Sequence, residues 1–175
     1  MGASREVAFS SLAEPALILV FASLAYRGGA LSLARMFTPH GGPSAAASTV
    51  LALGSLFVVL LAENSRIPVD DPNTHLELTM IHEVMVLDHG GPDLAFILHG
   101  AGLKLVLMSS LLVRLVLPEM PAAGALGSFI LGLFAVAVAI GLVESSMARL
   151  RLARVPQLLV AAICAATFGL ILTLR

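Results

Sequence analysis

Hydrophobic residues along the chain form five long runs separated by short polar stretches. The runs cover residues 7–26, 44–62, 94–113, 120–143 and 155–174. Each is close to the roughly 20 apolar residues that an α-helix needs to cross the hydrocarbon core of a bilayer. The period-two alternation of membrane barrel strands is absent from these runs. The pattern therefore predicts an all-α fold, a polytopic transmembrane helix bundle of about five spans, with residues 1–175 as a single membrane domain.

Composition supports lipid as the solvent of this chain. Of 175 residues, 58% are hydrophobic and 12% are charged, and the mean hydropathy is +0.99. A soluble domain carries about 25% charged residues, so there is too little polar side chain here to cover a water-facing surface. The net charge of -1 gives no electrostatic footprint for nucleic acid. Cys164 is the single cysteine, so we expect any redox centre to belong to another subunit.

The distribution of arginine predicts an orientation. The connection between the fourth and fifth runs holds the densest cluster of positive residues, Arg149, Arg151 and Arg154. The positive-inside rule places this connection in the cytoplasm. Counting spans back places the loop at 63–93 and the amino terminus on the same side. Arg27 and Arg35 then fall on the outer side, against the rule.

The acidic residues are concentrated in the connection between the second and third runs. Seven of the eleven lie there: Glu63, Asp70, Asp71, Glu77, Glu83, Asp88 and Asp93. Three of the five histidines are there too, namely His75, His82 and His89. Arg66 is the only fixed cation among them. Connections of this length are usually functional rather than passive links.

Prolines indicate the local structure of this loop. Ile67-Pro68 and Asp71-Pro72 disfavour the α conformation in the residue before each proline, so we expect residues 63–71 to be extended or turning. Asp71 can cap a helix whose first position is Pro72. This amphipathic helix is predicted to end near Leu87, before a Gly-Gly-Pro sequence.

The faces of this predicted helix differ in chemistry. One face is apolar and carries Leu76, Met80, Val84 and Leu87, whereas the opposite face carries His75, Thr79, His82 and Glu83. Glu77 falls on the apolar face, with Asp88 nearly in line with it. Loss of hydration there would raise the pKa of the Glu77 carboxyl and allow it to exchange protons. The alternative is a structural ion pair with Arg66 or with an arginine of another subunit. A zinc site is disfavoured because the histidine spacing matches no metal motif.

Five charged residues lie within or at the ends of the apolar runs. Glu14 and Lys104 are well inside, where each would cost about 2.5–3.5 kcal/mol if it faced lipid at mid-bilayer. Glu63 and Glu144 close the second and fourth runs, and Arg114 ends the third. These charges indicate either a hydrated polar pathway or a set of ion pairs between helices.

Three stretches resemble a known family. They are Ala-Glu-Asn-Ser-Arg-Ile-Pro-Val-Asp-Asp-Pro-Asn-Thr-His-Leu-Glu-Leu-Thr-Met-Ile-His-Glu at 62–83, Arg-Glu-Val-Ala-Phe-Ser-Ser-Leu-Ala-Glu-Pro-Ala-Leu at 5–17, and Val-Glu-Ser-Ser-Met-Ala-Arg-Leu-Arg-Leu-Ala-Arg-Val-Pro-Gln at 143–157. They resemble the membrane-anchor subunit of formate-hydrogenlyase-type, group 4 [NiFe] hydrogenases. That family is homologous to the subunit 1 family of the NADH-quinone oxidoreductase of respiratory complex I. Typical members carry further spans before the point where this chain begins, so the chain resembles the C-terminal part of a longer protein.

The resemblance implies a non-catalytic subunit of an oxidoreductase complex in the plasma (inner) membrane. It implies no cofactor on this chain, with the [NiFe] and iron–sulfur centres on the large and small hydrogenase subunits. The cytoplasmic loop at 63–93 would anchor that catalytic arm, and antiporter-like membrane subunits would be the other partners. The chain would couple electron transfer to proton or sodium translocation.

The resemblance implies roles for Glu14, Glu63, Arg66, Asp70, Glu77 and Asp88, and the charges of the apolar runs and the pattern of the loop add the other residues of the two sets that follow. Six form the expected proton path or coupling set: Glu14, Glu63, Glu77, Asp88, Lys104 and Glu144. Eight are expected to form the loop and bind partners: Arg66, Pro68, Asp70, Asp71, Pro72, His75, His82 and Glu83. Complex I members have a hydrophobic residue at the position of Asp71, which favours the hydrogenase branch. A quinone-site subunit of a complex I-like NADH dehydrogenase is the first alternative, and a stand-alone transporter or channel is the second.

Overall fold

The computed structural model describes residues 2–37, 43–69, 89–117, 121–147 and 154–175. These residues form α1 (Gly2–Gly28), α2 (Leu33–Met36), α3 (Pro43–Glu63), α5 (Pro92–Val116), α6 (Ala122–Ser146) and α7 (Val155–Leu174), and they contain no strand. Five helices are long and apolar enough to cross a membrane, over Val7–Gly28, Ala45–Glu63, Pro92–Val116, Gly124–Ser146 and Val155–Leu174. The all-α prediction and its five spans are confirmed. The amphipathic helix expected after Asp71 lies outside the described residues.

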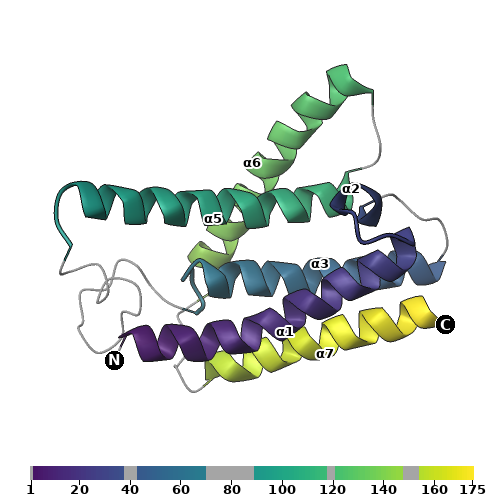
Figure 1. Cartoon of the computed structure of the whole chain (residues 1–175), viewed down its shortest axis with the longest axis horizontal. Coiled ribbons are helices and arrows are strands. Elements are labelled where there is room, and N and C mark those ends of the chain that lie inside the picture. Colours follow the sequence, from purple (N-terminus) through teal and green to yellow (C-terminus); the bar gives the residue numbers. More distant parts are fainter. Residues whose placement is uncertain (1, 38–42, 70–88, 118–120, 148–153) are drawn as a thin grey trace.

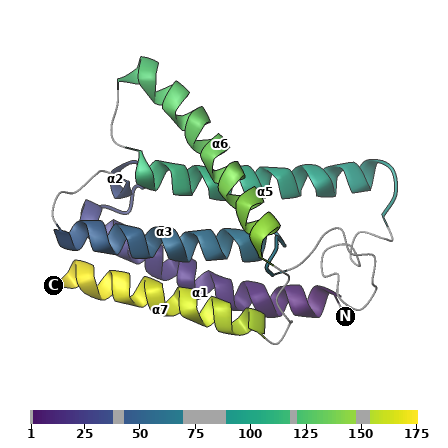
Figure 2. The same cartoon turned by 180° about the vertical axis from the view of Figure 1, so that it is seen from behind.

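Three helices, α1, α3 and α7, pack side by side and form the body of the molecule (Figure 1). Helix α5 runs antiparallel to α3 along its other side, and α6 crosses α5 obliquely (Figure 2). Helices α1, α5 and α7 begin at the end of the bundle where α3 and α6 finish. We call this the loop end, because the acidic connection leaves α3 and enters α5 there. The predicted relative topology of the connections is therefore confirmed, and the cytoplasmic side of the loop end stays a prediction.

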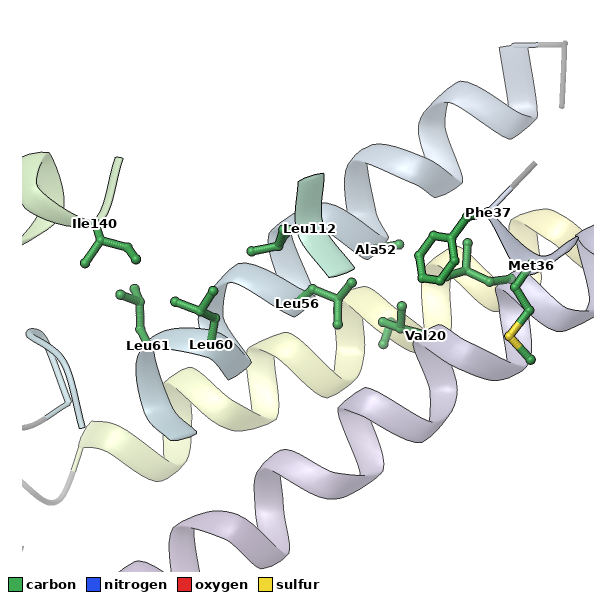
Figure 3. Close-up of a cluster of buried hydrophobic side chains, with 11 residues drawn as sticks. Val20, Met36, Phe37, Ala52, Leu56, Leu60, Leu61, Leu112 and Ile140 are labelled. Carbon is green, nitrogen blue, oxygen red and sulfur yellow. The ribbon is translucent and has the colours of Figure 1, made fainter. Parts of the chain in front are cut away.

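Helix α3 is the centre of the packing. Its buried residues Ala52, Ser55, Leu56, Val59 and Leu60 recur at the spacings that place side chains along one stripe of a helix. The main hydrophobic cluster joins this stripe to α1, α2, α5, α6 and α7 (Figure 3). The Ser55 hydroxyl donates a hydrogen bond to the main-chain oxygen of Ala162 in α7 at 3.0 Å, which satisfies its polar atom inside the bundle.

A second hydrophobic cluster lies nearer the loop end and includes a residue beyond α3. Val69 is 1% exposed and packs with Ala13, Val59, Val155 and Leu159 from α1, α3 and α7. Small residues such as Ala13 allow helices to approach closely in a membrane. The first residues of the acidic loop are thus held against the bundle.

Helices α5 and α6 are joined by a close crossing. A Cβ atom at Gly132 would lie 2.5 Å from Cγ1 of Val113, so the absence of a side chain at Gly132 makes this approach possible. Outside the crossing, both helices expose large apolar side chains, including Phe96, Leu131 and Phe134. Apolar faces of this kind suit contact with lipid rather than with water.

Candidate functional site

The end of α3 fixes the positions of two charged residues of the loop end, Glu63 and Arg66. The N–H of Ser65 donates to the oxygen of Ala62 at 3.3 Å, and the N–H of Arg66 donates to the oxygen of Leu61 at 2.9 Å. With Ser65 at φ 48°, these two bonds form the Schellman helix ending. A non-glycine residue costs about 1–2 kcal/mol in this left-handed conformation. The turn holds Arg66 just past the helix end, three residues after Glu63.

An ion pair connects Glu63 to the middle of α5. The distance from Lys104 Nζ to Glu63 Oε2 is 2.5 Å, and the two side chains are 38% and 13% exposed. Lys104 lies halfway along α5, whereas Glu63 is the last residue of α3. Residues 92–103 therefore extend about 18 Å beyond the end of α3, at 1.5 Å per helical residue. Figure 1 shows this overhang on the side where the acidic connection leaves the bundle.

A second ion pair links the start of the acidic loop to α6. Arg66 Nη1 lies 3.5 Å from Glu144 Oε1, with the side chains 36% and 28% exposed. The longer distance and the greater exposure of its carboxylate make this pair weaker than the one at Glu63. Together the two pairs connect α3, α5 and α6 at the loop end.

Both carboxylates lie in the last turn of a helix, Glu63 in α3 and Glu144 in α6. The carboxyl end of a helix carries a partial negative charge from its unpaired carbonyl groups, which disfavours a carboxylate there by about 0.3–1 kcal/mol. A cation from outside each helix, Lys104 or Arg66, offsets this cost.

Glu14 is separate from these pairs. Helix α1 continues through Glu14-Pro15, and Glu14 is exposed with no hydrogen bond or ion pair to any other described residue. An exposed carboxylate within a span must meet water, a cation or another protein surface in the membrane, because lipid would strongly disfavour it.

The structure therefore brings together four of the residues singled out by the sequence: Glu63, Arg66, Lys104 and Glu144. Pro68, predicted to bind partners, is buried within this chain. The remaining predicted residues lie outside the described part of the chain: Asp70, Asp71, Pro72, His75, Glu77, His82, Glu83 and Asp88.

Sequence reasoning missed the part played by Val69. The sequence feature that could have indicated this part is that Val69 is an apolar residue directly after Pro68, in a segment otherwise rich in charged residues. The structure shows that Val69 holds the loop start against α1 and α7. This anchoring keeps Arg66 near the end of α6, where it meets Glu144.

The fold and the charged loop end define a polytopic helical membrane protein with paired charges where its longest connection begins. The family described as NADH dehydrogenase matches residues 1–174, so the chain belongs to that family, as its resemblance to complex I-related membrane subunits predicted.

Among curated proteins, the chain is similar to Hydrogenase-4 component C of Escherichia coli (strain K12). The two are 36% identical over 119 residues, which cover 67% of this chain and 37% of that protein. The chain thus aligns with little more than a third of the relative's length. No solved structure matches it.

Proposed function

We propose that the chain is the membrane subunit of an energy-converting hydrogenase complex. In this role it anchors a cytoplasmic [NiFe] arm through its acidic loop and couples electron transfer to proton or sodium translocation. The similarity to Hydrogenase-4 component C supports the assignment to a hydrogenase. The [NiFe] and iron–sulfur centres are expected on partner subunits, with antiporter-like membrane subunits carrying part of the ion path.

The observation that carries the proposal is the pair of ion pairs at the loop end. Arg66 is the only lysine or arginine in the acidic connection, which holds seven of the eleven acidic residues. Its contact with Glu144 is 3.5 Å long and about one third exposed, so replacing Glu144 by a carboxylate of the loop as the partner of Arg66 costs little free energy. A partner that moves the loop would draw Arg66 away and leave Glu144 without its counter-charge.

The second ion pair, between Glu63 and Lys104, lies at the same end of the bundle. Glu63 is mostly buried and depends on Lys104 for its counter-charge. Removing the cation from a mostly buried carboxylate is strongly unfavourable, so a change at Lys104 would also disturb Glu63. Arg66 follows Glu63 by three residues in the turn that ends α3, so a displacement of the loop start would act on both ion pairs.

Inverted membrane vesicles that contain the whole complex provide the test. Lys104→Met and Glu63→Gln should leave the complex assembled and electron transfer measurable, while ion translocation per electron falls. Arg114→Gln is the matched control, because Arg114 is an exposed cation on the same helix, near the end that lies away from the acidic loop. Full translocation in Lys104→Met vesicles would overturn the coupling role, and loss of assembly in Arg114→Gln vesicles would show that the assay reports folding.

A quinone-site subunit of a complex I-like NADH dehydrogenase is the second candidate, favoured by the family match over residues 1–174. It differs from the first in requiring a quinone near the acidic loop. Photolabelling of the assembled complex with a quinone-site inhibitor would attach the label to this chain if the second candidate is right. Absence of labelling, together with hydrogen-dependent electron transfer, would favour the hydrogenase.

A further inference from the structure

The end of the bundle opposite the acidic loop has a rigid corner formed by α1, α2 and the start of α3. Met36 and Phe37 are each 8% exposed and anchor α2 in the main cluster (Figure 3). A Cβ atom at Gly28 would lie 2.5 Å from the main-chain oxygen of Arg35, so the chain folds back tightly there. Leu31 and Leu33 are nevertheless 88% and 59% exposed. Because Met36 and Phe37 are the residues that face the core, Leu31 and Leu33 face outward.

Arg27, in the last turn of α1, is fixed at this corner by hydroxyl groups. Its Nη1 donates to Thr49 Oγ1 at 2.7 Å and to Ser48 Oγ at 3.4 Å, both in the second turn of α3. Its Nε is buried and has no hydrogen-bond partner among the described residues. No described carboxylate pairs with Arg27. Residues 15–62 contain no aspartate or glutamate, so this stretch of the sequence cannot supply one.

The surroundings of Arg27 have the chemistry of a membrane boundary. Tyr26, the only tyrosine of the chain, is 59% exposed in the same helical turn. Tyrosine is enriched at headgroup level, where its ring meets apolar chains and its hydroxyl meets water. The exposed leucines would enter the acyl region beside these polar groups.

We propose that this corner binds the headgroup of an anionic phospholipid. The lipid phosphate would accept hydrogen bonds from the Arg27 guanidinium, whose orientation Thr49 already fixes, and its negative charge would balance the arginine. Leu31 and Leu33 would contact the acyl chains of the same lipid. A lipid fits better than a protein partner because the corner lies at the ends of apolar spans, where phosphate is the anion that the bilayer itself supplies.

The composition of the chain offers a direct test. With one tyrosine and no tryptophan, the intrinsic fluorescence of the purified full chain reports Tyr26 alone. The chain is reconstituted in protein-free phosphatidylcholine vesicles that contain a small fraction of nitroxide-labelled lipid, either phosphatidylglycerol or phosphatidylcholine. We expect labelled phosphatidylglycerol to quench Tyr26 more strongly, because one arginine near the surface enriches an anionic lipid about fivefold.

Variants separate charge from fold. Arg27→Gln should bring the quenching by the two labelled lipids to equality, Arg27→Lys should keep most of the difference, and Arg114→Gln should keep all of it. Arg114 is the control because it is an exposed cation near the same end of the bundle. Equal quenching by the two lipids in the unmodified chain would overturn the proposal. So would an absence of quenching by either lipid, which would mean that protein covers the corner. If Arg27→Gln fails to fold, the comparison of quenching by the two lipids in the unmodified chain still tests whether the corner prefers an anionic lipid.

Discussion

Replacing Lys104 by methionine removes the counter-charge of Glu63 while keeping an unbranched side chain of similar length on α5. The Glu63 side chain is 13% exposed and lies in the last turn of α3. In the variant its carboxylate would face the negative end of the helix with no cation beside it. The variant therefore isolates the electrostatic part of the contact between α3 and α5.

The size of the effect follows from burial. Removing one partner of a fully buried ion pair costs about 3–5 kcal/mol, whereas an exposed pair contributes about 0.2–1 kcal/mol. Glu63 is close to the buried limit, but Lys104 is 38% exposed, so we expect Lys104→Met to lower the free energy of unfolding by about 2 kcal/mol. That is about a 30-fold change in the unfolding equilibrium constant. The double variant Lys104→Met, Glu63→Gln should be close to the unmodified chain, because neither charge then remains unpaired.

A double-mutant cycle measured by denaturant unfolding in mixed micelles, followed by helical circular dichroism, gives the coupling free energy directly. The control cycle uses Arg66→Gln and Glu144→Gln, whose pair is 3.5 Å long and about one third exposed. We expect coupling of about 2 kcal/mol for the first pair and under about 1 kcal/mol for the second. Equal couplings, or a double variant less stable than Lys104→Met alone, would refute the reasoning.

Three further predictions concern packing and the isolated acid, and each is checked by the same unfolding measurement. Gly132→Val should cost about 1–3 kcal/mol, because its side chain would collide with Val113, and Val113→Ala in the same chain should restore part of the loss; no loss in Gly132→Val would mean that α5 and α6 do not cross there. Leu60→Ala should cost about 2–5 kcal/mol because Leu60 is 0% exposed, whereas Leu131→Ala, at a 72% exposed position, should stay within about 0.5 kcal/mol; similar losses would contradict the assigned core. Glu14→Gln should not lower the stability of the chain, because no described residue pairs with Glu14, and a clear loss would reveal a partner within the chain.

The spans could be predicted from sequence because length and apolarity alone decide them. The predicted run at 155–174 coincides with α7, and the other predicted ends differ from the observed spans by a few residues. Of the residues 63–71 that were predicted to be extended or turning, 64–69 lie outside any helix, whereas Glu63 is still the last residue of α3. These features depend on neighbours along the chain.

The pairing of the charges could not be predicted, because it depends on how far one helix slides past another. Apolar periodicity fixes the face that a helix buries but not its axial position. Only the offset of α5 brings Lys104, halfway along its helix, to Glu63 at the end of α3. The close approach of Gly132 to Val113 could not be predicted either, because a glycine in an apolar run does not indicate which residue of another helix it contacts.

The proposed function requires the loop end to face the cytoplasm, and single cysteines in a Cys164→Ser background report the side of the membrane that it faces. Asp93→Cys lies in the exposed first turn of α5 at the loop end, and Ser32→Cys lies exposed at the opposite end. An impermeant thiol reagent should label Asp93→Cys only in inverted vesicles and Ser32→Cys only in intact cells or spheroplasts. Labelling of Asp93→Cys from outside intact cells would place the acidic loop away from any cytoplasmic electron-carrying partner and contradict the proposed function.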